Sequence, residues 1–294
     1  MISMNFTGTA KINDYRRFLS NANPITPKAP RIFPPNRPLT RGRVRARGQM
    51  TDSSPPEESP QAPDPLVAAM EEHQGNFYWA VKSIARRVET DARGEVTLLF
   101  IKFTVKVGDE GFKLLGQLAH LQKLDASASL ITCSGAEPLS KLQHLEELIL
   151  DMTQIGDEGL TFISKLPLLH RLSLSATRVG DLGLKTIAKL RGLESLDLSG
   201  TNITHVGLEY LRPLSNLTHL DLSENGIRDG GIQHLQAFEQ LQSLSLNHNR
   251  LTDASAKALK GFKRMKFLHL KGNQISNSSA AKLIESMPHA TINI

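Results

Sequence analysis

A repeat with a fixed period constrains this chain more than any other feature of its sequence. Each repeat opens with a run of the form L-x-x-L-x-L, as in Leu193, Leu196 and Leu198. Six such runs follow one another at a constant step, since 169 − 145 = 24 and every later interval is the same: Leu145, Leu169, Leu193, Leu217, Leu241 and Met265. A fixed period in this range predicts stacked units that share one continuous core, because a unit this short cannot bury its own leucines.

Each unit reads as a strand, a tight turn and a short helix. Alternate side chains of a strand face opposite sides, so Leu196 and Leu198 should point into the core. Three residues further on stands a Thr or Asn that can satisfy backbone groups at the bend: Thr153, Thr177, Thr201, Asn225, Asn249 and Asn273. Helix N-caps are expected at Asp157, Asp181, Asp229 and Asp253. Since every unit runs the same way, the strands must pair in parallel, with the helices across the core.

The turn segments resemble a known repeat family. TQIGDEGL (153–160), TRVGDLGL (177–184) and TNITHVGL (201–208) are similar to a bacterial leucine-rich repeat subtype with a T-x-[IV]-x-D-x-G-L core. The resemblance implies an α/β fold, a right-handed β/α horseshoe-shaped solenoid with a parallel concave sheet and short outer helices. It also implies that the concave face usually binds other proteins, and it implies no reaction.

The sequence divides into three regions. Residues 97–294 contain two degenerate units, six regular units and a final partial strand. Residues 64–96 have helical apolar spacing followed by a hairpin with its turn at 91–94, and we expect them to cap the first core layer. Trp79, the only Trp, is expected in the core of this cap rather than at a binding hot spot.

The first degenerate unit breaks the leucine pattern. Lys102 stands where Leu150 stands two periods later. We expect either that the strand slips so that Phe103 fills the leucine site, or that Lys102 extends its amine to solvent.

Residues 1–63 are rich in Pro, Arg and Ser and lack periodicity, so they are predicted to be disordered. Residues 1–49 carry ten Lys or Arg and one Asp, a net charge of +9, so residues 50–294 carry −3 of the total of +6. Three interpretations remain open for the basic part: an arm for nucleic acid or another anionic surface, an organelle transit peptide, or sequence upstream of an initiator at Met50. The segment from Met50 is acidic and Pro-rich.

The outward strand positions form three columns on the concave face. The residues expected to bind a partner come from these columns: Glu147, Arg171, Ser173, Asp197, His219, Asp221, Ser245, Phe267, His269 and Lys271. Asp197 and Asp221 should be neighbours about 4.8 Å apart across the sheet. This acidic centre is either a solvated surface or the receptor for a basic or polar patch on a partner protein.

Catalysis is not expected, although Ser195, Asp197, His219 and Asp221 include the residue types of a hydrolytic triad. An open strand face provides no nucleophile elbow and no pocket that excludes water. No motif for a cofactor or a metal is present, and the single cysteine, Cys133, excludes an internal disulfide framework. Because the sequence has no apolar run long enough to span a membrane and no signal-peptide core near the start, we expect no membrane association and a cytoplasmic location.

These features predict a non-catalytic protein-protein interaction module that binds a partner protein through its concave strand face. Two alternatives remain open. The chain could be a substrate-recognition adaptor of a larger complex, as in the leucine-rich receptors of ubiquitin ligases, although residues 64–96 contain no recognisable F-box. It could also associate with nucleic acid through its basic N-terminal residues.

Overall fold

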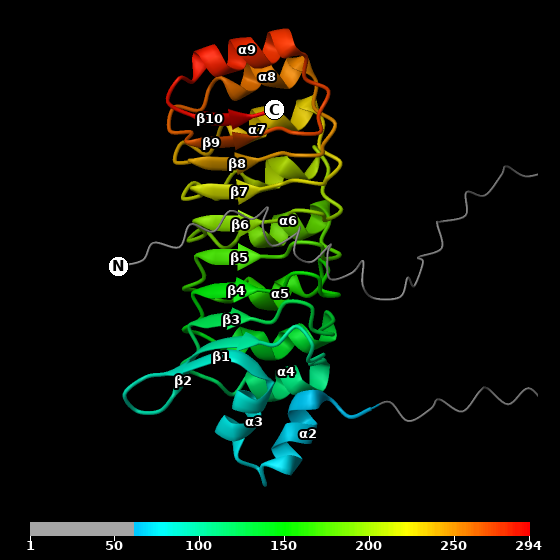
Figure 1. Ribbon diagram of the computed structural model, residues 1–294, viewed down its shortest axis with the longest axis vertical. Helices are drawn as coiled ribbons and strands as arrows, with labels where there is room; N and C mark the ends of the chain where they lie inside the picture. Colours follow the sequence, from blue (N-terminus) through cyan, green and yellow to red (C-terminus); the bar gives the residue numbers. More distant parts are fainter. Residues whose placement is uncertain (1–61) are drawn as a thin grey trace, which may run out of the picture. The chain divides into compact units, whose positions relative to one another are not determined.

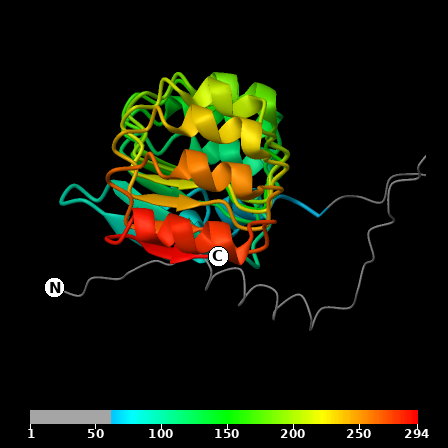
Figure 2. The ribbon, with the colours of Figure 1, turned by 90° about the horizontal axis from the view of Figure 1, so that it is seen from above.

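A computed structural model describes residues 62–294 as a stack of short strands with helices on the opposite side of the core (Figure 1). The predicted disordered segment 1–63 lies outside the described residues except for its last two. The strands form one ten-stranded sheet in the order β1 to β10, with β1 antiparallel to β2 and all later neighbours parallel. Figure 2, viewed along the stack, shows successive units displaced sideways from one another. The predicted α/β solenoid is confirmed.

The strands after the hairpin are very short, and most of the helices span two turns or fewer. The strands are β1 Ala85–Thr90, β2 Val96–Ile101, β3 Lys123–Asp125, β4 Glu147–Ile149, β5 Arg171–Ser173, β6 Ser195–Asp197, β7 His219–Asp221, β8 Ser243–Ser245, β9 Phe267–His269 and β10 Thr291–Asn293. The helices are α2 Pro65–Glu72, α3 Phe77–Ile84, α4 Asp109–Leu115, η1 Ser134–Lys141, α5 Leu160–Ile163, α6 Asp181–Ile187, η2 Gly207–Leu211, α7 Asp229–Leu235, α8 Asp253–Leu259 and α9 Asn277–Ser286.

Aliphatic side chains fill the core. The leucines of neighbouring strands are paired one above another, as Leu172, Leu196 and Leu220 are, and each is at most 2% exposed. Leu198 and Ile203 of the same units are fully buried. Each buried leucine stabilises the fold by about 1.5–3 kcal/mol relative to its exposed state, so the contacts between units hold the stack together.

The Thr and Asn column satisfies backbone groups at the bend after each strand. Thr177 donates its hydroxyl to the carbonyl of Leu174 at 2.6 Å. Asn249 does more, because its amide nitrogen donates to the carbonyls of Leu222 and Leu246, and its oxygen accepts the N–H of Ile227 at 3.0 Å. The asparagines therefore tie a unit to the one before it, whereas the Thr177 hydroxyl bonds within its own unit.

The expectation that the repeated aspartates cap their own helices is wrong. Asp181 is the first residue of α6, and its carboxylate accepts the N–H and the hydroxyl of Thr204 in the next unit at 2.8 and 2.7 Å. Asp253 forms the same pair of bonds with Ser276, and these bonds lower the pKa of its carboxyl. Four further carboxylates accept a backbone N–H ahead of the next helix in the same way: Asp64, Asp109, Asp157 and Asp229. Asp181, Asp229 and Asp253 are the first residues of their helices, so they stand one residue after the N-cap position.

The glycine of the D-x-G-L motif makes room for this carboxylate. A Cβ atom on Gly207 would lie 2.2 Å from Asp181 Oδ1 of the preceding unit. One on Gly183 would lie 2.4 Å from Asp157 Oδ1. Serine occupies the glycine position in the last two units, as Ser255 and Ser279, and the Ser255 hydroxyl instead donates to Asp229. The Asp and Gly of the motif are thus partners across adjacent units.

The ladder of aspartates is interrupted at two units. Cys133, which is half-buried, and His205 stand at the aspartate position of their units. His205 Nδ1 is buried without a hydrogen-bond partner among the described residues. Both units have a 3₁₀ helix, η1 or η2, where most others have an α-helix.

The first repeat unit differs from both expectations for its strand. Leu99 pairs with Leu124, and their separation of 124 − 99 = 25 residues is one more than the repeat period. Ile101 therefore fills the site that Leu150 occupies two units later, and it is 2% exposed. Lys102 therefore lies outside that site, and its amine donates to the carbonyl of Ser83 at 2.7 Å. Phe103 is exposed. The strand slips in the direction opposite to the one predicted, and the extra residue is absorbed before α4.

Helices α2 and α3 and the β1–β2 hairpin lie at the end of the stack next to the first unit (Figure 1). Leu66, Ala80 and Val81 are fully buried there. The expected burial of Trp79 is wrong, because its side chain is 49% exposed. Aliphatic side chains fill the core of this region instead.

We predict that His205→Asp stabilises the protein. The next unit already has Gly231, whose missing side chain leaves room for the new carboxylate. The N–H of Arg228 stands at the position whose N–H donates to the aspartate in other units. One additional charge-assisted bond should raise the free energy of unfolding by about 1 kcal/mol, measured by urea denaturation. Val206→Asp places the same charge on an exposed neighbour and should give no comparable gain. Equal stability of His205→Asp and the parent would contradict the ladder.

Candidate protein-binding face

The structure places the predicted partner-binding residues in columns along the sheet. Strand register brings Glu147, Arg171, His219 and Phe267 into the first column and Ser173, Asp197, Asp221, Ser245 and His269 into the second. Lys271 follows β9 at the position of the third column, where its N–H donates to Asn247 Oδ1 at 2.8 Å. Asp197 and Asp221 are directly opposite one another, as predicted from the period.

The face extends three strands further than the sequence indicated, onto β3, β2 and β1. Glu89 is paired with Leu98, and Leu98 is paired with Lys123. These three residues continue the first column. Arg87 is paired with Phe100, which is paired in turn with Asp125 and continues the second. Sequence reasoning missed these residues because the slip of β2 puts this unit out of step with the repeat period. The run of Val96–Ile101 is almost entirely apolar and shows no polar–apolar alternation, so the sequence carries no local signal for these positions.

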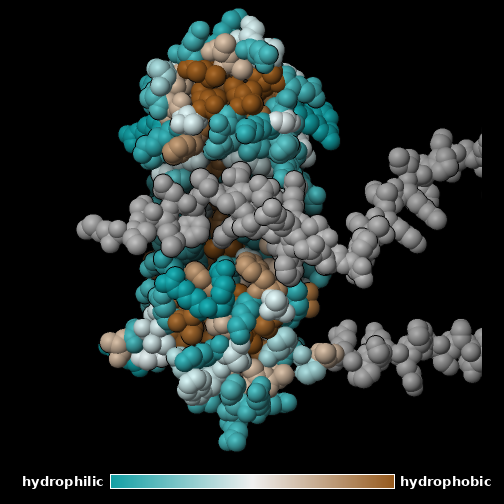
Figure 3. Space-filling view, viewed as in Figure 1, coloured by the Kyte–Doolittle hydropathy of each residue, from teal (hydrophilic) through white to brown (hydrophobic). Residues whose placement is uncertain are grey.

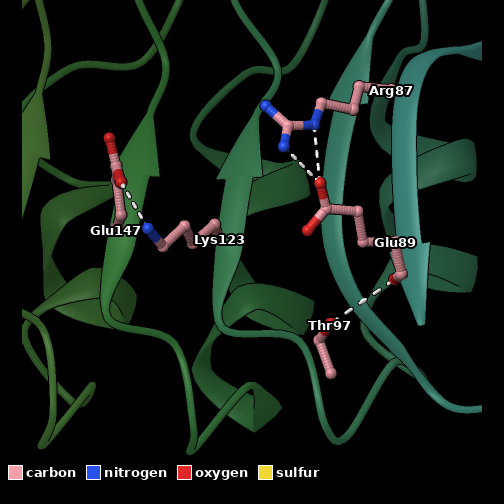
Figure 4. Close-up of polar contacts among 5 residues, drawn as sticks. All are labelled: Arg87, Glu89, Thr97, Lys123 and Glu147. Atoms are coloured by element: carbon pink, nitrogen blue, oxygen red, sulfur yellow. Dashed lines mark hydrogen bonds and ion pairs between the residues drawn. The ribbon is translucent and has the colours of Figure 1, made fainter. Parts of the chain in front are cut away.

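Charges alternate along the first column near the N-terminal end. Lys123 Nζ and Arg171 Nε each lie 3.7 Å from an oxygen of Glu147, on either side of it. Figure 4 shows Lys123 and Glu147 pointing toward one another from neighbouring strands, and Arg87 paired with Glu89 on the hairpin. Such exposed pairs contribute little stability, at most about 1 kcal/mol each. Their effect is to neutralise this part of the face.

The second and third columns are acidic in the middle of the stack. From β4 to β8 these positions include Asp151, Asp197 and Asp221 and no Lys or Arg. Ser199 donates its hydroxyl to Asp197 Oδ1 at 2.7 Å, and its N–H does so at 2.9 Å. The N–H of Ser223 donates to Asp221 Oδ1 at 2.8 Å. The outward serines therefore hold the carboxylates in fixed positions.

Burial shifts the pKa values of the carboxyl groups on the strand face. Removal from water raises the pKa of Asp151 to about 6, against a bond from the Ser173 hydroxyl at 2.5 Å that lowers it. The charge of Asp197 adds to the increase. Burial likewise raises the pKa of Asp221. A cationic partner would stabilise the charged forms and would recover part of this cost of burial.

The histidines of the face are biased toward the neutral form. Burial lowers the pKa of His219, and the charges of Arg171 and Lys266 lower it further. Burial also lowers the pKa of His269, whose Nδ1 is 2.9 Å from the Asn293 amide nitrogen. These rings therefore add hydrogen-bonding capacity to the face and little charge at pH 7.

The residue types of a hydrolytic triad are not assembled as one. His219 Nδ1 is bonded to its neighbour Thr218 Oγ1 at 2.8 Å, and Asp221 accepts from Ser223 in its own unit. Within residues 62–294, no three His, Cys, Asp or Glu side chains are grouped so that they could hold a metal ion. No helix in this part of the chain is long and apolar enough to cross a membrane.

A polar face on a stack of parallel strands, with helices across the core, defines a β/α repeat protein. Residues 126–291, more than half of the chain, match the family model of the leucine-rich repeat region. The chain belongs to the leucine-rich repeat family. This fold is generally a protein-interaction module, and proteins of this kind are typically non-catalytic. A comparison with curated protein sequences gave no match.

Solved structures share the fold at low sequence identity. Internalin C2 from Listeria monocytogenes is 22% identical, with a TM-score of 0.56 over 79% of this chain and 93% of that one. An internalin (inlF) from the same organism is 21% identical, with a TM-score of 0.46 over 62% of this chain and 63% of that one. A leucine-rich repeat protein from Leptospira interrogans is 20% identical, with a TM-score of 0.44 over 62% of this chain and 57% of that one. This chain thus spans less than two thirds of the latter two.

We predict that Asp151→Asn stabilises the protein at neutral pH. The pKa of Asp151 in the folded protein is about 6, above its ordinary value of 3.8. The stabilisation that depends on the neutral carboxyl is therefore complete below about pH 4 and is lost as the pH rises through 6. An amide does not ionise, so the variant should gain on the order of 1–3 kcal/mol at pH 7.5 and progressively less toward pH 4. Thermal unfolding across this pH range measures the difference.

Asp91→Asn is the matched control. Bonds from the N–H groups of Glu95 and Arg93 lower the pKa of Asp91 in the exposed hairpin turn, so its charged form stabilises the fold. The control should show no gain at pH 7.5. A gain for Asp151→Asn that is independent of pH would contradict the assignment of its cause to ionisation.

Proposed function

We propose that the chain is a non-catalytic interaction module whose concave strand face binds a partner protein. The observation that carries the proposal is the fixed acidic centre of that face, where Asp197 and Asp221 are directly opposite across β6 and β7. Like charges at this spacing are unfavourable in an isolated sheet. They become favourable when a basic patch on a partner lies over them, so the proposed partner surface is basic or polar.

Rigidity supports the same proposal. The bonds from Ser199 and Ser223 fix the carboxylates, and the strands that carry them are paired on both sides. A surface ordered before binding loses little conformational entropy when a partner arrives. The first column supplies further polar contacts from Glu147 and Arg171 at the edge of the acidic centre.

The test compares the parent with the double variant Asp197→Ser and Asp221→Ser. Affinity capture from cell extract with the full chain as bait identifies the partner, with Asp197→Lys and Asp221→Lys as the charge-reversed bait. Titration of the purified partner from about 50 to about 300 mM salt then measures the dissociation constant and its salt dependence. We expect the double variant to bind about tenfold more weakly at low salt and to show a shallower salt dependence.

Glu158→Ser is a matched control. It removes a carboxylate from the helical side of the stack, away from the strand columns, and should leave the affinity unchanged. The proposal fails when the same proteins bind the parent and both concave-face variants with equal affinity and equal salt dependence.

A further inference from the structure

Exposed aromatic rings alternate with cations on the α3 end of the molecule. Trp79 is 49% exposed and Tyr78 is 38% exposed, with ring centroids 5.6 Å apart at 72°. Lys82 Nζ lies 4.6 Å from the centroid of the Trp79 ring and 5.8 Å from that of Tyr78. Phe103, directly after β2, is 37% exposed. Single exposed apolar residues are ordinary, but several large rings together mark an interaction surface.

The rings and cations form one continuous surface. Lys102 bonds the carbonyl of Ser83 on α3 at 2.7 Å, next to Phe103. The guanidinium carbon of Arg86 lies 5.3 Å from the Phe103 ring and 5.6 Å from the Phe100 ring. We call this the aromatic-cationic surface: Tyr78, Trp79, Lys82, Arg86, Lys102 and Phe103. Figure 3 shows apolar and polar atoms intermingled at the corresponding end of the molecule.

This surface continues into the concave face. Arg86 Nη2 lies 3.3 Å from Asp125 Oδ2, and the Asp125 side chain is 4% exposed. Phe100, which Arg86 contacts, is paired with Asp125 in the second column. A partner that lies along the concave columns therefore reaches the aromatic-cationic surface without crossing a gap in the sheet.

The side chains specify the chemistry of the segment that would lie here. Tyr, Trp and Arg dominate the binding energy of protein interfaces, because they bury a large area at low entropic cost. The contacts of Lys82 and Lys102 among the described residues are to rings and a carbonyl oxygen, not to carboxylates. A segment with a carboxylate beside an apolar side chain satisfies both the cations and the rings.

A nucleic acid fits this position less well, although base stacking on aromatic rings beside cations is a common way to bind single strands. Asp125, Asp151 and Asp197 line the adjoining columns. A phosphate backbone that continued onto these columns would be repelled, whereas a polypeptide can present opposite charges at its two ends.

We propose that the partner-binding surface extends onto the aromatic-cationic surface, where it takes an acidic segment that carries an apolar side chain. The inference rests on the proposed function, and it predicts the direction in which the partner lies along the sheet. The acidic-apolar end lies over α3 and β2, and the basic end lies over β6 and β7. Trp79 and Lys82 are the anchors of the acidic end.

A library of random short peptides displayed on phage, selected on the full chain, provides the probe. Enriched peptides should combine Asp or Glu with an aromatic or aliphatic neighbour. The most enriched peptide, synthesised with a fluorescent label, is then titrated against the parent, Trp79→Ala and Lys82→Glu. We expect each variant to bind about tenfold more weakly. Trp79 is the only Trp of the chain, so its fluorescence should also change when unlabelled peptide binds the parent.

Controls separate binding from folding and from the concave-face proposal. Tyr210→Ala removes a ring that is 37% exposed on η2 and should leave peptide affinity unchanged, and circular dichroism should show that all variants are folded. Equal peptide affinity for the parent, Trp79→Ala and Lys82→Glu overturns the inference. Quenching of Trp79 fluorescence by an oligothymidylate, with no change in that fluorescence when acidic peptide is added, also overturns the inference. Basic peptides that depend on Asp197 and Asp221 alone would overturn this inference while supporting the proposed function.

Discussion

The packing of each repeat unit against the next is the interaction on which the rest of the structure depends. A unit contains a very short strand and a short helix, and it cannot enclose its own leucines. Leu196 is buried because Leu172 and Leu220 lie on either side of it. The ends of such a stack are therefore its vulnerable parts, and the α2–α3 region covers one of them with aliphatic side chains.

Polar contacts between units then determine how the units are aligned. Leucine packing is non-directional and tolerates small displacements, whereas a hydrogen bond does not. Asn249 reaches back to Leu222, and Asp181 reaches forward to Thr204, so each unit is fixed to both neighbours. This alignment brings the outward side chains into straight columns. The face that we propose for partner binding is thus shaped by bonds made at the turns and helix starts, outside the face itself.

The period of the sequence was sufficient to predict the parallel sheet, the buried leucines and the register of Asp197 with Asp221. It was insufficient where the answer depends on a neighbouring unit or on the end of the stack. Local sequence preference predicted that Asp181 is an N-cap, but its carboxylate instead accepts the N–H of Thr204 in the next unit. Ile101 replaces the expected residue because one extra residue before α4 shifts the strand, and a shift has no local signal. Trp79 is exposed because Ala80, Val81 and Ile84 are on the side of α3 that faces the core.

The side chains that break the columns distinguish this chain from a generic repeat. Serine suffices at most outward positions and carries no cost of burial, yet Asp151 and Asp221 are carboxylates whose pKa values are raised by burial. A residue that reduces stability at neutral pH, when serine is compatible with the same strand position, supports the binding role that we propose for this face. The same reasoning applies to Trp79, because a half-exposed indole is unfavourable in water until another surface covers it. We propose that both departures belong to one partner-binding surface, which extends from the α3 end of the stack to its acidic centre.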